Sequence, residues 1–166
     1  INGKSYGKQS KNNSSLKSRY RLMWMDAVYE PGEVKVVAYN KDGKAVAEKT
    51  VRTAGKPHHI ELVSNRNELT ADGKDLAYVT VKVVDKDGNL CPTDSRLIHF
   101  SVKGAGKFRA VANGDPTNLE QFHLPKMHAF HGMLTAIVQA GEIAGDLVLT
   151  AKASGVKTGT VHLQAK

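Results

Sequence analysis

Alternation of apolar and polar positions is the main signal along this chain, and it is typical of β-strands. Residues 76–84 alternate most clearly, because Ala77, Val79, Val81 and Val83 share one face. Gly-, Asn- and Asp-rich turn signals separate the runs. No window carries a helical stripe bounded by caps, so we expect almost no helix. Further strands are predicted at 34–39, 45–53, 59–63, 97–102, 108–112, 133–139, 146–153 and 156–163.

A Gly-Pro linker at residues 54–57 divides these strands into two sets. About seven strands with regularly spaced turns follow the linker, which matches an immunoglobulin-like β-sandwich. Residues 1–54 supply about four strands, too few for a complete sandwich. We therefore predict an all-β chain with two tandem immunoglobulin-like modules: a partial, N-terminally truncated module at 1–55 and a complete one at 56–166.

The first residues, INGK, are typical of the end of a strand entering an Asn-Gly hairpin turn. The strand that should come before the turn is missing, so we expect a fragment of a longer protein. No apolar run approaches the roughly 18 residues of a membrane span, and we expect no membrane partner.

One segment, residues 113–132, breaks the strand rhythm. Its 20 residues include two prolines, three of the seven histidines and two of the four phenylalanines. Compact domains seldom contain an irregular loop of this length without a functional or packing role. This loop, predicted to lack regular structure, is the first candidate for function.

The carboxylates do not favour a catalytic site. Most aspartates fall in predicted turns, where the side chain usually bonds its own backbone. Asp115 and Glu120 share the long loop and could face each other, as glycoside hydrolysis requires. Nothing beside them predicts a deep pocket, so we expect no catalytic residue.

Metal and thiol chemistry are also disfavoured. Residues 85–89, DKDGN, differ from a calcium loop in the position of glycine and fit a hairpin turn better. His123, His128 and His131 could gather a zinc ion with a loop carboxylate, but their spacing fits no standard site. The lone Cys91 is expected to be structural. We expect no metal ion and no cofactor.

The single tryptophan, Trp24, is the other candidate. Alternation places Trp24, Asp26 and Val28 on one face of a predicted strand. A core or interface position is the usual one for tryptophan. An exposed platform that binds sugar is the alternative, because tryptophan also favours binding surfaces.

The net charge of +8 has a local origin. Residues 1–25 contain six basic side chains and no acid, whereas the remaining residues contain 18 basic and 16 acidic ones. The basic stretch lacks the interleaved aromatic residues of a single-strand binder, so we expect no nucleic-acid partner. Hydrophobic residues at 40% and charged residues at 24% exclude a disordered chain.

Several motifs resemble family 2 glycoside hydrolases. Residues 24–39, WMDAVYEPGEVKVVAY, resemble the stretch W-x-D-V-x-Y-x-P-G-x-L-x-x-V-A-Y that follows the catalytic barrel in Bacteroides-type β-galactosidases, and residues 1–5 resemble the hairpin before it. Residues 70–76 and 83–89 resemble the opening of the next immunoglobulin-like domain. That domain's signature N-G-D-P-T…E-x-F…A-F-x-G is matched by NGDPT at 113–117 with Glu120, Phe122 and Phe130.

This resemblance implies a non-catalytic C-terminal region of a retaining β-galactosidase. The family's catalytic glutamates lie on a barrel of about 250 residues, more than the 166 present. The implied partner is that barrel, and the implied location is periplasmic or cell-surface. Candidate contacts with carbohydrate or a neighbouring domain are Trp24, Asn113, Asp115, Glu120, Phe122 and Phe130.

One position departs from the family pattern. Family members often carry arginine three residues before the second phenylalanine, where this chain has Met127. If that arginine pairs with the loop carboxylate, Glu120 here lacks its partner. Lys126 would not reproduce a bidentate fork.

Two other functions stay open: a carbohydrate-binding module that uses Trp24 or the 113–132 loop, and a bacterial immunoglobulin-like adhesion repeat. Open strand edges at 1–54 must also be covered or paired. We therefore predict a homodimer in which the N-terminal strands pair with a second copy.

Overall fold

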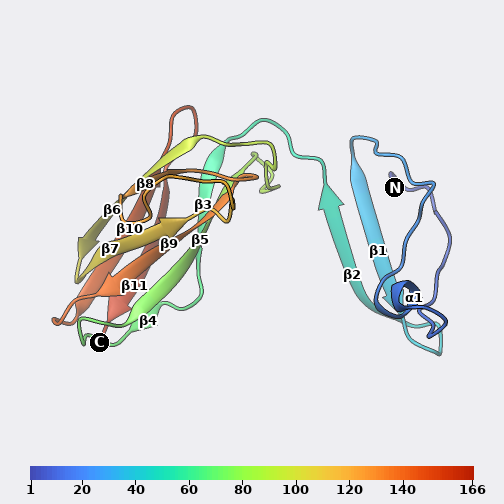
Figure 1. Ribbon diagram of the computed structural model, residues 1–166, viewed down its shortest axis with the longest axis horizontal. Coiled ribbons are helices and arrows are strands. Elements are labelled where there is room, and N and C mark those ends of the chain that lie inside the picture. Colours follow the sequence, from blue (N-terminus) through green and yellow to red (C-terminus); the bar gives the residue numbers. More distant parts are fainter. The chain divides into compact units, whose positions relative to one another are not determined.

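The computed structural model describes all residues from 1 to 166, and the chain divides into two compact units (Figure 1). The N-terminal unit spans Ile1–Thr53 and the C-terminal unit spans Ala54–Lys166. Strands dominate the C-terminal unit, the N-terminal unit contains two of them, and the one helix has five residues. The all-β prediction is confirmed. The structure contains no helix with the length and apolar character that a membrane-spanning segment needs.

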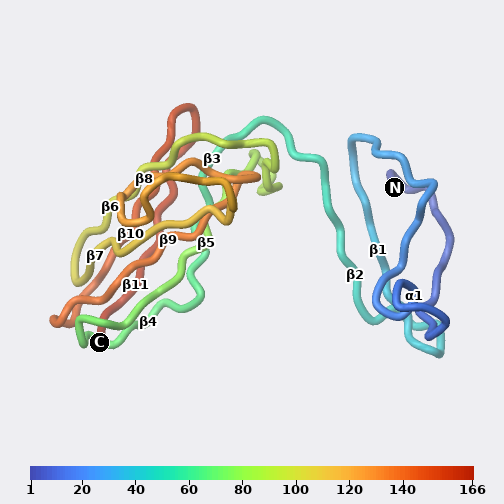
Figure 2. The backbone as a smooth tube through the Cα atoms, in the orientation of Figure 1, coloured from blue at the N-terminus to red at the C-terminus, as the bar shows by residue number.

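The C-terminal unit is a β-sandwich of two stacked sheets (Figures 1 and 2). One sheet has the order β4-β11-β10-β6-β8 and the other has the order β3-β5-β9-β7. All pairings are antiparallel except that of β11 with β4. The strands are β3 (His59–Ser64), β4 (Glu68–Leu69), β5 (Leu76–Val84), β6 (Leu97–Gly104), β7 (Gly106–Ala112), β8 (Lys126–His128), β9 (Met133–Ala140), β10 (Gly145–Lys152) and β11 (Gly159–Ala165).

The core of this unit lies between the two sheets. The four alternating positions of β5 predicted to share a face are fully buried, which confirms the period-two pattern. Ile98, Leu147 and Leu149 of the other sheet are also fully buried and belong to the same cluster. Phe100 and Phe108 stack with ring centroids 5.8 Å apart. Each large buried side chain contributes about 1.5–3 kcal/mol relative to exposure.

The N-terminal unit consists of the helix α1 (Leu16–Tyr20) and a hairpin of β1 (Glu33–Tyr39) and β2 (Ala45–Arg52). The prediction of about four strands here is wrong, and so is the strand at Trp24. Around Trp24 the backbone forms local turn hydrogen bonds instead of strand pairing. For example, Ala27 N donates to Trp24 O. A strand exists only where a neighbouring backbone accepts its hydrogen bonds.

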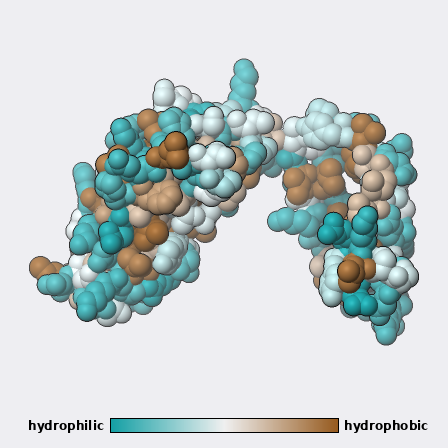
Figure 3. All heavy atoms as spheres, viewed as in Figure 1, coloured by the Kyte–Doolittle hydropathy of each residue, from teal (hydrophilic) through white to brown (hydrophobic).

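Burial differs sharply between the units. Every buried residue belongs to the C-terminal unit, and none of the residues 1–53 is buried. The N-terminal unit therefore has no closed hydrophobic core, and many of its apolar side chains are open to solvent (Figure 3).

Candidate functional site

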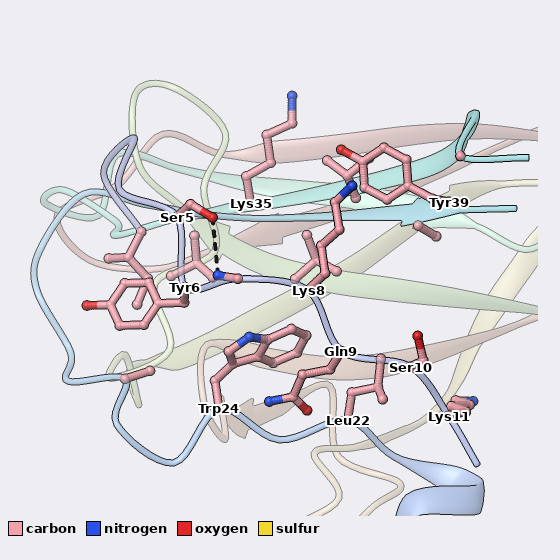
Figure 4. A pocket seen from close by; sticks show the side chains of 18 of the residues that line it. Ser5, Tyr6, Lys8, Gln9, Ser10, Lys11, Leu22, Trp24, Lys35 and Tyr39 are labelled. Carbon is pink, nitrogen blue, oxygen red and sulfur yellow. Dashed lines mark hydrogen bonds between the residues drawn. The ribbon is translucent and has the colours of Figure 1, made fainter. Parts of the chain in front are cut away.

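Trp24, the candidate in the N-terminal unit, lines a hollow of about 820 Å³. The walls of the hollow are the extended residues 4–11, Leu22 and strand β1 (Figure 4). Trp24 is partly buried, and its indole Nε1 is shielded from solvent without a hydrogen-bond partner. Buried indole N–H groups usually find an acceptor, and this one has none in the structure.

The polar side chains of Gln9 and Lys8 at this hollow contact other segments of the N-terminal unit. Gln9 Nε2 donates to Met23 O at 2.7 Å, and Met23 N donates to Gln9 Oε1 at 3.2 Å. The ammonium of Lys8 lies 4.7 Å from the ring centroid of Tyr39, on the opposite wall. These groups are occupied within the unit and do not converge on one ligand position.

The other five candidates lie in the C-terminal unit, in the loop between β7 and β9. The prediction that residues 113–132 lack regular structure is wrong at one point, because β8 forms inside the loop and pairs with β6. Two backbone bonds extend this anchoring: Val111 N donates to Phe122 O and Phe100 N donates to Pro125 O, both at 2.8 Å. The loop thus covers the otherwise open edges of β7 and β6, which would template pairing with other chains.

Inside the loop, the structure brings Asn113, Glu120 and His128 together. Glu120 Oε1 lies 3.0 Å from His128 Nδ1, and Glu120 Oε2 accepts the His128 backbone N–H at 3.1 Å. Asn113 Nδ2 donates to His128 O at 3.0 Å. Glu120 lacks the arginine of the family pattern, but His128 is its partner in this structure. Only the register of β8 reveals this pair.

Asp115 has a separate set of contacts. Its carboxylate accepts Thr117 N at 2.8 Å and Thr117 Oγ1 at 2.7 Å, and these two bonds hold the pKa of Asp115 below its usual range. Its backbone N–H donates to Asn113 Oδ1 at 3.1 Å. A general acid needs a raised pKa, so Asp115 is suited to shaping the turn.

The histidines of the loop separate in the structure. His128 pairs with Glu120, while His131 Nδ1 lies 3.2 Å from Pro92 O. No group of three or more histidine, cysteine or carboxylate side chains lies close enough to hold a metal ion. Phe130 is partly buried, with its ring centroid 4.2 Å from that of His131.

The exposed surface of the loop includes three large apolar side chains. Leu119 is 96% exposed, Phe122 is 56% exposed and Leu124 is also exposed. Phe122 was a sequence candidate, but Leu119 and Leu124 were not. Their apolar character in a stretch without alternation is the signal that marks them.

Two family models match this chain. Residues 60–162 match the glycoside hydrolase family 2 C-terminal domain 5, and residues 1–47 match a domain of unknown function (DUF4982).

The chain is similar to parts of several longer proteins. It is 42% identical over all 166 residues to the beta-galactosidase BoGH2A of Bacteroides ovatus, of which it spans 19%. It is 34% identical over 111 residues, 67% of this chain, to a beta-galactosidase of Thermoanaerobacter pseudethanolicus, of which the match spans 13%. A solved glycosyl hydrolase family 2 member from Bacteroides cellulosilyticus superimposes with a TM-score of 0.84 at 31% identity, covering 98% of this chain and 22% of that one. The chain thus spans about a fifth of the length of BoGH2A and of the Bacteroides cellulosilyticus protein.

Proposed function

Because this chain belongs to the glycoside hydrolase family 2 C-terminal domain 5 family, we propose that it is the non-catalytic accessory region of a β-galactosidase-type hydrolase. The parent enzyme removes terminal β-galactosides with retention, and this region packs against its catalytic barrel. Relatives named as beta-galactosidases support the substrate class. A periplasmic or cell-surface location stays a prediction from the resemblance.

The observation that carries this proposal is a contrast within the 113–132 loop between polar side chains that are bonded internally and apolar side chains that are exposed. The side chains of Asn113, Asp115 and Glu120 are bonded within the loop itself. The most exposed large apolar side chains of this internally bonded loop, Leu119 and Phe122, are left free to contact a partner. Exposed apolar groups on a rigid frame fit a protein surface, and the catalytic barrel is the proposed surface.

The test uses the full-length hydrolase with the double substitution Leu119→Asp and Phe122→Asp. If these side chains are buried against the barrel, as proposed, each substitution places a carboxylate in that contact, at a cost of about 1.5–3 kcal/mol per site. We expect a lower urea midpoint for the full-length enzyme and reduced hydrolysis of a chromogenic β-galactoside at temperatures near that transition.

The matched control is Ile143→Asp, because Ile143 is also an aliphatic residue of the C-terminal unit and is 79% exposed. It lies between β9 and β10, outside the loop, and should leave the midpoint unchanged. Equal effects of the control and the loop variant would contradict the proposal. So would hydrolysis of the galactoside by the purified 166-residue chain, or saturable binding of galactosides that Phe122→Ala abolishes.

A further inference from the structure

Acidic and basic side chains that lie directly opposite each other on neighbouring strands form salt bridges in this chain. In the hairpin, Glu33 lies opposite Arg52, with 2.7 Å between the charged groups. In the four-stranded sheet, Glu61 lies opposite Lys82, with 3.2 Å between them. Opposite charges stabilise such positions, whereas like charges directly opposite each other destabilise them. Both sheets therefore follow the ordinary pairing rule.

The five-stranded sheet departs from this rule on its outer face. His99 of β6 lies directly opposite Lys126 of β8 on one side and directly opposite Lys152 of β10 on the other. All three are exposed, whereas the adjacent Ile98 and Met127 are buried, so this row points away from the core. Neither lysine takes part in a salt bridge. The row thus consists of basic groups alone.

Lys103 extends the positive charge along the same face. It is exposed, lies four residues from His99 on β6 and takes part in no salt bridge. Strand spacing separates the backbones of Lys126 and Lys152 by about 10 Å, and Lys103 lies about 13 Å along the strand from the row. We call Lys103, Lys126, Lys152 and His99 the basic face.

Hydroxyl groups lie between these lysines. Ser101 of β6 is opposite Thr150 of β10, which is opposite Thr160 of β11. Alternation along β6 and β10 places this second row on the same outer face, between Lys103 and the row of His99. The basic face therefore combines separated ammonium groups with hydroxyl groups that can donate and accept hydrogen bonds.

The nearby carboxylates leave most of this charge uncompensated. Glu120, at the edge of β8, is bonded to His128, and Glu68 of β4 is paired with Lys166. Asp146 lies six residues from Lys152 along β10, a distance of about 20 Å. A basic row kept against the cross-strand rule, without a local compensating gain, is the kind of position where a functional role is expected.

The surroundings of the basic face favour one class of anion. Strands β6, β8, β10 and β11 contribute no large apolar side chain to the exposed set. Protein hot spots and single-stranded nucleic acids use aromatic anchors, and membrane-surface helices insert apolar groups. A flat surface of ammonium and hydroxyl groups fits a ligand that is itself rich in hydroxyl groups and carries spaced negative charges.

We propose that the basic face binds an acidic polysaccharide, with carboxylate or sulfate groups along its chain. The ammonium groups of Lys126, Lys152 and Lys103 pair with the anionic groups, and the hydroxyl row bonds to the sugars between them. The choice of a glycan rests on the proposed function, since the parent enzyme acts on glycosides. Holding one part of a polymer on this face raises the effective concentration of its other sugars at the parent's catalytic site.

Calorimetric titration of the 166-residue chain with polygalacturonate tests the proposal. The double substitution Lys126→Gln and Lys152→Gln removes two charges of the row without breaking a salt bridge, and it should weaken binding by about tenfold or more. Wild-type affinity should also fall about tenfold as sodium chloride rises from about 50 to about 200 mM. The neutral polymer dextran should not bind.

The matched control is Lys74→Gln with Lys86→Gln. Both lysines are exposed, belong to the C-terminal unit outside the five-stranded sheet and form no salt bridge. The control has the same net charge as the test variant and should bind polygalacturonate like the wild type. Equal losses in the two double variants would mean that binding follows net charge alone, which would overturn the inference.

A second measurement locates the ligand on the wild-type chain. Polygalacturonate should protect Lys103, Lys126 and Lys152 from acetylation and leave Lys74 and Lys86 reactive. Dextran sulfate serves as the sulfated probe. Tighter binding of polygalacturonate would assign a uronate ligand, and tighter binding of dextran sulfate would assign a sulfated one. Uniform protection of all five lysines would contradict a site on the basic face.

Other occupants give different results. Tighter binding of phosphatidylserine vesicles or of a single-stranded oligonucleotide than of both acidic polysaccharides would overturn the inference. So would a full-length hydrolase in which the three lysines are shielded and no polyanion binds, because the parent would then cover this face. The titrations use the 166-residue chain, whereas the Leu119 and Phe122 test uses the full-length enzyme, so either proposal can fail without the other.

Discussion

At the residue scale, the carboxylates of this chain mainly organise its own backbone. Asp85 is the one charged side chain in the buried set, at 2% exposed. It accepts Gly55 N at 2.7 Å and Asn89 N at 2.8 Å, which ties the start of the C-terminal unit to a turn after β5. The backbone bond from Gly55 and the side-chain bond from Asn89 hold the pKa of Asp85 far below its usual range.

This lowered pKa predicts a pH-dependent role for Asp85. A depressed folded-state pKa stabilises the fold fully above the unfolded-state value of about 3.9, and the stabilisation is lost as the pH falls below it. Asp85→Asn should therefore lower the melting temperature at neutral pH. The difference from the wild type should shrink as the pH falls from about 5 toward 2.

Asp87→Asn is the control, because Asp87 is exposed in the same turn. It should leave the melting temperature unchanged. A wild-type-to-Asp85→Asn difference that stays constant across this pH range would contradict the assigned role.

At the element scale, the three-residue strand β8 gives regular structure to part of a loop that the sequence predicts to be irregular. Lys126 and His128 point outward, whereas Met127 is fully buried opposite Ile98 of β6. Because position 127 points into the core, an apolar side chain such as methionine suits it. The strand also places the His128 backbone within reach of Glu120, which no local sequence pattern predicts.

The burial of Met127 predicts the effect of placing an arginine at this position. Met127→Arg should destabilise the C-terminal unit by about 3–5 kcal/mol, because it buries an uncompensated charge. Met127→Leu should cost less than about 1.5 kcal/mol, since it preserves volume and polarity. Denaturant unfolding of the 166-residue chain measures both, and equal stabilities of the two variants would show that β8 opens to accommodate arginine.

At the scale of the whole molecule, stability is concentrated in one unit. The core cluster and the apolar residues packed against it all belong to Ala54–Lys166. Removing residues 1–53 should therefore change the free energy of unfolding by no more than about 1 kcal/mol. Thermal and urea unfolding of residues 54–166 and of the whole chain provide the comparison. A loss of several kcal/mol would mean that the N-terminal unit stabilises the sandwich.

The sequence by itself determined the β-class of the chain, the inward positions of β5 and the family motifs. These features are local, since a strand's two faces and a motif's residue order are written in neighbouring positions. The loop residues Asn113, Asp115 and Glu120 were recognisable as candidates for the same reason. Their contacts were not, because Glu120 meets His128 only through the register of β8.

Tertiary structure alone decided which predicted strands exist and which apolar residues are buried. The Trp24 segment alternates like a strand, yet no neighbouring backbone pairs with it, so it forms the wall of a hollow. Val36 and Val79 look alike in sequence, but only Val79 has a second sheet to cover it. Burial depends on what packs from the other side, and in the C-terminal unit that second sheet comes from residues distant in sequence.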